Sequence, residues 1–320
     1  MRKLPIKKTL SRLRHLRAFF GPGTHKLQDV RLAFGILKST IARWVVGPGD
    51  WKPTYLDETT STNLSKNTVI GVFVHVHFSE NLPELVEALE CAPFQYKLFV
   101  SSSRKEVLDE FGLLASARGI NCTSALVSNQ GRNFFPLLAA FKDDIMKFEV
   151  ALHLHTKNSG HSKGSLGDAW RRILWKSLIL DAGSARRFVQ LMSADKAAAI
   201  AYPDVSSLIR PINFCWGQSL SAAQTILRKI NFASSNLNQE YFAFPAGGMM
   251  YFRPVLFAEL FDYPWSEDDF PSENGQIDGT TQHALERLFG YLASQKELKH
   301  IIYDPDKDRF TNEETYTSRR

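Results

Sequence analysis

Four histidines stand in two pairs whose spacing suits ligand binding: His75 with His77, and His153 with His155. Each pair lies near the end of an apolar run, and a spacing of two places both imidazoles on one face of an extended strand. We expect His77 and His155 to reach a ligand, because the polar segments S-E-N and T-K-N-S come next. The inner two are predicted to be hydrogen-bonded core residues, since buried polar groups are usually satisfied.

Imidazoles on adjacent strands could also bind zinc or another transition metal. We do not expect a metal, because neighbouring strands hold side chains side by side and Lys157 would repel a dication. Lysine, hydroxyl and imidazole donors suit a phosphate instead. The segment H-L-H-T-K-N-S-G-H-S-K-G is therefore interpreted as a polyphosphate cradle, with Arg132 of N-Q-G-R as a further cation. Arg132 could equally be a solvated residue of an ordinary turn.

A second concentration of charge is S-E-N-G-Q-I-D-G-T-T-Q-H-A-L-E-R, residues 272–287. The change from turn residues to an apolar helical period predicts that a helix begins near residue 279, with Asp278 or Thr280 as its cap. Within that helix His283 shares a face with Glu286 and Arg287. A base, an acid and a cation would then stand together at one helix start.

An alternation of strands and helices that starts at residue 69 must position these residues. Strands are predicted over residues 68–78, 96–102, 123–128, 149–157 and 197–203, and helices over 81–91, 104–118, 133–147 and the segment W-R-R-I-L-W. Apolar strands that alternate with helices indicate an α/β fold, a mainly parallel sheet flanked by helices on both faces. Ligands of such sheets bind beyond the carboxyl ends of the strands, where the histidine pairs fall.

The chain has 320 residues and a formal net charge of +6, much of it in the first 43 residues, where Asp29 is the only acid. Residues 1–46 are predicted to form a basic amphipathic helical extension. This extension could lie on an anionic membrane surface, pack on the body as a hairpin, or bind a partner. Nucleic acid is not expected, because the basic residues form no face interleaved with aromatic residues.

The remaining chain divides by composition. Residues 47–68 are predicted to be a linker, residues 69–306 the folded domain and residues 307–320 a flexible polar tail. No apolar run approaches the roughly 20 residues needed to cross a bilayer. The cysteine count of three, with no C-x-x-C pair, indicates neither a disulfide framework nor a thiolate zinc site. We therefore expect a cytoplasmic protein, peripheral on the inner face of the plasma membrane.

Several blocks, in this order, resemble the rhamnan synthesis protein F family of bacterial polysaccharide assembly. They are H-V-H-F, N-Q-G-R-N-F-F-P-L-L, H-L-H-T-K-N-S, W-R-R-I-L-W, F-P-A-G-G-M-M-Y-F-R-P and E-N-G-Q-I-D-G-T-T-Q-H-A-L-E-R. The resemblance covers residues 69–295, and Asn133 departs from it where the family usually has aspartate. It implies a glycosyltransferase that resembles the GT-A class, with a nucleotide-binding half followed by an acceptor half.

In the GT-A class an acid-x-acid motif after the fourth strand holds a divalent metal on the donor diphosphate. Here the same place reads H-L-H-T-K. The resemblance therefore implies a diphosphate that is neutralised by cationic and imidazole groups rather than by a metal. The predicted donor-binding residues are His77, Arg132, His155, Lys157 and Arg287. No cofactor is expected, with a divalent metal kept as the alternative.

The acceptor half is implied by the block F-P-A-G-G-M-M-Y-F-R-P, interpreted as a strand or near-strand. Gly247 and Gly248 would let the backbone approach a sugar closely, although interior glycines also mark bulges. Trp170, Arg171 and Glu286 complete the predicted sugar-binding set.

Inverting sugar transfer needs a base that takes the proton of the attacking hydroxyl. Asp278 is the preferred candidate, Glu273 is the second, and His283 lies close to both in sequence. A helix start lowers the pKa of a carboxyl, so desolvation or a neighbouring acid must offset that effect. In the competing interpretation Asp278 simply caps the helix, as aspartates commonly do.

Two functions from different classes follow. The first is a hexosyltransferase, a rhamnosyltransferase that uses dTDP-L-rhamnose to extend a lipid-linked glycan of a cell-surface polysaccharide, such as rhamnan or the O-antigen of lipopolysaccharide. Its alternatives are another deoxyhexose or furanose nucleotide as the donor, and a retaining rather than an inverting outcome. The second is a non-catalytic carbohydrate-binding or scaffolding subunit of a polysaccharide assembly complex. A histidine-metal hydrolase is a third and weaker alternative.

Overall fold

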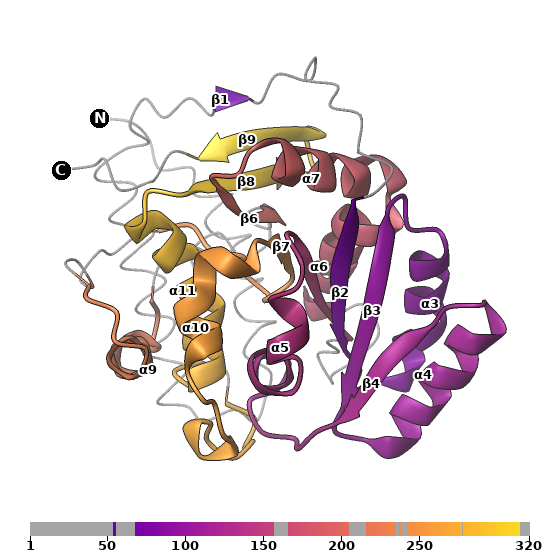
Figure 1. Ribbon diagram of the computed structural model, residues 1–320, viewed down its shortest axis with the longest axis horizontal. Helices are drawn as coiled ribbons and strands as arrows, with labels where there is room; N and C mark the ends of the chain where they lie inside the picture. Colours follow the sequence, from indigo (N-terminus) through magenta and orange to yellow (C-terminus); the bar gives the residue numbers. More distant parts are fainter. Residues whose placement is uncertain are drawn as a thin grey trace, which may run out of the picture.

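The computed structural model describes residues 54–55, 68–156, 166–204, 216–234, 237, 242–276 and 278–313. The predicted basic extension, residues 1–46, and Lys157 lie outside these ranges. One sheet of nine strands, in the order β1-β9-β8-β6-β7-β5-β2-β3-β4, forms the centre of the described fold (Figure 1). Among the residues in these ranges, no helix has both the length and the apolar character needed to cross a bilayer.

Four parallel strands make up one half of the sheet: β2 (Val69–His75), β3 (Gln95–Ser102), β4 (Cys122–Leu126) and β5 (Ala151–His155). The inner strands β2 and β5 are almost wholly buried, whereas the edge strand β4 is largely exposed. Burial on both faces explains why β2 and β5 are apolar runs rather than alternating patterns. The predicted α/β class is confirmed.

The other half of the sheet is mixed. It contains β6 (Ala198–Pro203), β7 (Met250–Phe252), β8 (Lys299–Asp304), β9 (Arg309–Glu313) and β1 (Thr54–Tyr55). Strands β6 and β8 are parallel, but β7 runs antiparallel to both β5 and β6, and β9 runs antiparallel to β8 and β1. The mainly parallel arrangement therefore holds for the first half of the sheet alone.

Strands β9 and β1 fall in segments predicted to be tail and linker. Arg309–Glu313 pairs with β8, and Thr54–Tyr55 pairs with β9. The unpaired N–H and C=O groups along the edge of β8 offer hydrogen bonds to any extended segment that reaches them. The sheet therefore extends beyond the predicted domain boundaries at residues 69 and 306.

The described helices are α3 (Leu82–Glu90), α4 (Lys105–Ala117), α5 (Lys142–Ile145), α6 (Leu166–Trp175), α7 (Ala182–Ala194), α9 (Leu220–Lys229), α10 (Ala258–Asp262) and α11 (Thr281–Gln295). Two π-helical turns, Pro136–Ala140 and Lys176–Leu180, precede α5 and follow α6, and short 3-10 turns occupy Ser79–Asn81, Pro254–Phe257 and Glu267–Asp269. The predicted helix over residues 133–147 is thus a π turn followed by the short α5. Figure 1 shows α3 and α4 together beside the β2–β4 half.

Helices cover both faces of the sheet. Neighbouring side chains of a strand point to opposite faces, and Tyr251 and Phe252 are neighbours in β7. The Tyr251 ring stacks on Phe188 of α7 with centroids 5.2 Å apart, whereas the Phe252 ring meets Phe289 of α11 at 5.4 Å. Helices α7 and α11 therefore lie on opposite faces, and the two aromatic residues anchor one each.

The strand order reverses between β2 and β5. The chain runs from β2 outwards through β3 and β4, then returns to place β5 on the other side of β2. Ligands of doubly wound sheets bind outside the carboxyl ends of the strands at such a reversal. His75 and His155, the last residues of β2 and β5, are paired in register. Both histidine pairs therefore end at the switch point of the sheet.

Candidate functional site

Polar residues that follow β2, β3, β4 and β5 are linked at the switch point. The His77 backbone N–H donates to Thr156 Oγ1 at 2.8 Å, and His77 Nδ1 lies 3.1 Å from Ser103 Oγ. Ser103 Oγ in turn donates to Asn129 Oδ1 at 3.3 Å. We call His77, Ser103, Asn129 and Thr156 the polar row. Because Ser103 uses its proton on Asn129, it accepts from His77 Nδ1, which leaves His77 Nε2 as an acceptor.

The His77 imidazole is neutral at pH 7. Burial lowers its pKa most, and the positive charge of Arg104 lowers it further, while Glu106 and Glu273 act in the opposite direction. A neutral ring can form hydrogen bonds but cannot neutralise a diphosphate.

The inner histidines are core residues, as predicted. His75 Nδ1 lies 3.0 Å from Ser101 Oγ, and His153 Nδ1 donates to the Gly248 carbonyl at 2.7 Å. Burial lowers the pKa of His75 to about 3, and the repulsion that His77 and His153 would exert when protonated acts in the same direction. Burial likewise lowers the pKa of His153 to about 4, despite its hydrogen bonds to backbone. Both rings are uncharged at any physiological pH.

His155, predicted to bind the diphosphate, holds a backbone turn instead. Its side chain is buried, and its Nε2 donates to the Gly247 carbonyl at 2.7 Å. His153 holds the next carbonyl, that of Gly248. The two histidines of β5 therefore bind the backbone of one turn. The strand predicted over F-P-A-G-G-M-M-Y-F-R-P is confined to β7. This geometry does not support a diphosphate contact by His155.

The Gly247–Gly248 turn gathers most of the predicted sugar-binding residues. Both glycines have left-handed backbones, with φ of 95° and 70°. The Gly247 N–H donates to Glu286 Oε1 at 3.0 Å. A Cβ on Gly247 would stand 2.7 Å from Leu174 Cδ1 and 3.1 Å from Trp170 Nε1. Trp170, Glu286 and both glycines thus meet, and only glycine fits the turn.

Arg171 does not join this set. Its side chain is buried, and its Nη1 lies 3.2 Å from Glu84 Oε2 of α3. Its guanidinium also lies over the Trp175 ring, 4.8 Å from the centroid. These contacts tie α6 to α3, so the structure favours a packing role for Arg171 over a sugar contact.

Arg132 stands at the centre of a second set of contacts. Its Nε and Nη2 each lie 3.0 Å from Glu273 Oε2, and its Nη2 also donates to the Gln276 carbonyl at 3.0 Å. Glu273 Oε1 accepts from Gln282 Nε2 at 2.8 Å, and Arg132 Nη1 lies 3.3 Å from His283 Nε2. We call Arg132, Glu273, Gln282 and His283 the arginine cluster. It joins the loop after β4 to the start of α11.

In the arginine cluster, Arg132 has an unusual backbone conformation and His283 has a defined tautomer. Arg132 has a left-handed φ of 51°, which is strained for a side chain of its size. Arginine only donates, so His283 Nε2 accepts and its Nδ1 donates to Thr280 Oγ1 at 2.6 Å. Thr280 is the N-cap residue of α11, one of the two predicted caps. The helix start therefore orients His283 towards Arg132.

Asp278, the preferred base, is held in a buried ion pair. Arg287 Nη1 lies 3.2 Å from its Oδ1, which also accepts from Ser219 Oγ at 2.7 Å, and Oδ2 accepts from the Gln218 N–H at 2.9 Å. Burial alone would raise the pKa of Asp278, but Arg287 and these hydrogen bonds outweigh it and lower the pKa. The arrangement favours a structural carboxylate over a base. It likewise engages Arg287, which was predicted to bind the donor.

Several residues of the site were missed in the sequence. Ser103 and Asn129 of the polar row follow β3 and β4, and Arg104 donates to the His77 carbonyl at 3.3 Å. The signal was present, because S-S-S-R and S-N-Q-G follow apolar strands just as the histidine segments do. Within the described ranges, no three His, Cys, Asp or Glu side chains converge as metal ligands. Lys157, which follows β5, lies outside the described residues.

A protein-family model described as rhamnan synthesis protein F matches residues 52–298. Two proteins from strains of Xanthomonas campestris pv. campestris, both named "Uncharacterized protein WxcX", are 27% identical to the chain over 222 residues. The match covers 68% of this chain but 30% of each relative, so the chain spans less than a third of their length. The family match extends over most of the chain and includes both the polar row and the arginine cluster. The chain therefore belongs to the rhamnan synthesis protein F family.

Proposed function

We propose that the protein is a glycosyltransferase of polysaccharide biosynthesis that takes its sugar from a nucleotide diphosphate. Membership of the rhamnan synthesis family supports this activity. The observation that carries it is that the polar row and the arginine cluster meet in the loop after β4, where Asn129 accepts from Ser103 and Arg132 donates to Glu273. Hydrogen-bonding groups for a nucleoside and ionic groups for transfer chemistry thus meet where α/β sheets bind ligands.

The polar row is the proposed nucleoside side of the donor site. Its members are uncharged and present donors and acceptors, which suits a base and ribose better than a phosphate. The Gly247–Gly248 turn, with Trp170 and Glu286, is the proposed sugar side. The donor proposed is dTDP-L-rhamnose, because the family is named for rhamnan synthesis.

Arg132 is the proposed diphosphate ligand. Its side chain is 33% exposed and its partner Glu273 is 18% exposed, so the pair is open to an incoming anion. A diphosphate carries more charge than one carboxylate and can accept hydrogen bonds from two N–H groups of the guanidinium at once. Binding of the donor therefore exchanges Glu273 for the diphosphate on Arg132, with Lys157 as a second proposed cation. On this basis we propose that transfer does not depend on a metal ion.

Glu273, released by this exchange, is the proposed general base. It takes the proton of the acceptor hydroxyl, whose oxygen forms a bond to the anomeric carbon of the donor. The bond from that carbon to the diphosphate oxygen breaks with its electron pair kept by that oxygen, and Arg132 stabilises the negative charge of the departing nucleoside diphosphate. Attack opposite the leaving group inverts the anomeric centre. His283 keeps Arg132 oriented throughout.

The variant Glu273→Gln tests this assignment. General-base catalysis contributes roughly 100- to 10,000-fold, so we expect kcat to fall within that range. Donor affinity should stay equal or rise, because glutamine competes less for Arg132. Steady-state kinetics and calorimetric donor titration measure both quantities. The control is Glu267→Gln, an exposed acid outside both sets of residues. Wild-type kcat in Glu273→Gln would remove Glu273 from the mechanism.

The donor and the class of function are tested by turnover. The full chain is incubated with dTDP-L-rhamnose and a lipid-linked glycan in anionic or neutral vesicles, and dTDP release is followed. We expect release, with faster turnover in anionic vesicles if residues 1–46 bind the membrane surface. Release from another sugar nucleotide but not from dTDP-L-rhamnose rejects the donor. Glycan binding without turnover of any donor supports the scaffolding subunit instead.

A further inference from the structure

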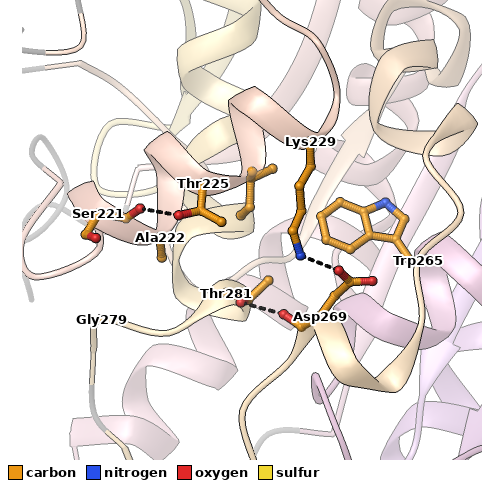
Figure 2. A pocket seen from close by; sticks show the side chains of 9 residues that line it. Ser221, Ala222, Thr225, Lys229, Trp265, Asp269, Gly279 and Thr281 are labelled. Atoms are coloured by element: carbon orange, nitrogen blue, oxygen red, sulfur yellow. Dashed lines mark hydrogen bonds and ion pairs between the residues drawn. The ribbon is translucent and has the colours of Figure 1, made fainter.

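A cavity of about 250 Å³ lies beside the start of α11, between α9 and the segment that leads into α11 (Figure 2). Its walls are formed by Ser221, Ala222, Thr225, Ile226, Lys229, Trp265, Asp269, Gly279 and Thr281. None of these residues belongs to the polar row or to the arginine cluster. Thr280, which orients His283, lies between two of them in sequence. The cavity is therefore separate from the proposed transfer site but adjoins it.

Hydroxyl groups line the cavity. Thr225 Oγ1 donates to the Ser221 carbonyl at 3.0 Å, and Thr281 Oγ1 donates to the Asp269 carbonyl at 2.8 Å. Each threonine oxygen thus donates its proton to backbone and keeps a lone pair that can accept, although Thr225 Oγ1 also accepts from Arg228 Nη2 at 3.4 Å. The Ser221 side chain is a third hydroxyl in the wall. A ligand that donates several hydroxyl protons would be matched by these acceptors.

The charges in the wall cancel. Lys229 Nζ forms an ion pair with Asp269 Oδ1, drawn as a dashed line in Figure 2. Hydrogen bonding to Asp269 raises the pKa of Lys229. Burial would raise the pKa of Asp269, but Lys229 and the Ser266 N–H outweigh it and lower the pKa. Both groups stay ionised, so the cavity offers strong donors and acceptors without net attraction for an anion or a cation.

An apolar surface completes the cavity. Figure 2 shows the Trp265 indole beside the Lys229–Asp269 pair, and Ile226 also belongs to the wall. Trp265 Nε1 donates to the Leu260 carbonyl at 2.7 Å, which fixes the orientation of the indole. A rigid aromatic group next to hydroxyls and a neutralised ion pair complements a ring that is apolar on its C–H surface and polar at its rim.

We propose that this cavity binds a neutral saccharide unit of the growing glycan. The volume lies just below the roughly 300–1,000 Å³ of most small-molecule pockets, which suits one sugar ring rather than a nucleotide. The inference rests on the proposed function in that the saccharide belongs to the acceptor. A subsite next to the first turn of α11, which carries His283, would hold the glycan while the end of the glycan reaches Glu273.

The test is binding of a synthetic neutral trirhamnoside to the full chain, followed by ligand-observed NMR and calorimetry. Ala222→Phe fills the cavity, and we expect at least a tenfold loss of affinity. Gln224→Phe adds the same side chain to the exposed, non-lining position two residues on, and should leave affinity unchanged. Thr225→Val keeps the shape of threonine and removes one acceptor, so a three- to tenfold loss is expected. Wild-type affinity in both cavity variants overturns the proposal.

Two comparisons separate this inference from the transferase itself. Ala222→Phe and Thr225→Val should bind dTDP-L-rhamnose as the wild type does, and loss of donor binding in Thr225→Val would overturn the separate cavity. Preference for an anionic oligosaccharide, such as a galacturonic acid trimer, would overturn the claim of a neutral ligand. If no sugar nucleotide is turned over but the cavity variants still lose the trirhamnoside, the cavity stands and the transferase function fails.

Discussion

Arg132 and Arg287 form ion pairs with carboxylates 5 residues apart in sequence, yet burial gives the two pairs different uses. The side chains of Arg287 and Asp278 are 5% and 7% exposed, whereas those of Arg132 and Glu273 are 33% and 18% exposed. Separating a buried pair leaves an uncompensated charge out of water, which is costly. A partly exposed pair can exchange partners, because water and an incoming anion replace the hydrogen bonds that the pair loses. This contrast is why Glu273 replaces Asp278 as the proposed base.

The variant Asp278→Asn should therefore unfold more easily rather than lose chemistry selectively. Asparagine has the same shape but leaves Arg287 without a counter-charge, and breaking a buried pair costs about 3–5 kcal/mol. Urea unfolding at pH 7 measures the free energy of unfolding, with the exposed Asp268→Asn as the control. A variant of wild-type stability that has lost turnover would restore Asp278 as the base.

The same pair has a defined pH dependence. The folded pKa of Asp278 is lowered, so its contribution to stability is present above the unfolded value of about 3.9. That contribution is lost as the pH falls through the folded pKa.

Among the strands and helices, β5 and α11 cooperate to form one turn. His153 and His155 of β5 hold the two glycine carbonyls, and Glu286 of α11 holds the Gly247 N–H. The turn precedes β7, which enters the sheet antiparallel to β5. Three side chains from two elements thus determine where the backbone lies next to Trp170. The proposed sugar side of the site is rigid for this reason.

Replacing Gly247 by alanine tests this turn. A φ of 95° is unfavourable for alanine, and its Cβ would stand 2.7 Å from Leu174 Cδ1, so we expect a loss of about 1–3 kcal/mol in unfolding free energy. The matched variant is Gly112→Ala in α4, where the new Cβ would meet no atom within 4 Å apart from its chain neighbours and the backbone of its own helix. Helix propensity should make that variant more stable by about 0.5–1 kcal/mol. Equal stability of the two variants would contradict the role of the turn.

Across the described fold, burial keeps three histidines uncharged. Burial lowers the pKa of His75 to about 3 and those of His153 and His300 to about 4. In the unfolded chain each titrates near 6.5. Between these values the unfolded state binds more protons than the folded state. Stability is therefore fully present above about pH 6.5 and falls as the pH drops towards 4.

Each buried histidine should contribute up to about 1.4 kcal/mol per pH unit to this slope. His300 lies in β8, away from the proposed site, with its ring nitrogens 3.1 Å from Tyr202 Oη and 3.3 Å from Ser294 Oγ. In His300→Gln the free energy of unfolding should fall less steeply between pH 7 and pH 5 than in the wild type. The difference in slope should equal the contribution of one histidine. Urea titrations at three pH values measure the slope. An unchanged slope in His300→Gln would show that His300 binds protons equally in the folded and unfolded states, which would contradict its lowered pKa.

Local pattern was sufficient for the framework of the fold. The apolar runs predicted β2, β3, β4 and β5, and the capping rule included Thr280 at the start of α11. It also placed the histidine pairs at strand ends, which the register of His75 with His155 confirms. These features depend on residues within a few positions of one another, so periodicity and cap chemistry carry them.

The partner of each polar side chain could not be predicted, because it comes from a distant part of the chain. His155 meets Gly247 across 92 residues, and Arg132 meets Glu273 across 141. Likewise β7 is only three residues long, and its place in the sheet is set by its pairing with β5. The segment of β9 is a strand because it pairs with the edge of β8. Long-range packing decides which charges are buried and paired and which stay open to a ligand. Residue types and spacing therefore supplied the candidate chemistry, and burial in the folded chain separated structural groups from those available for function.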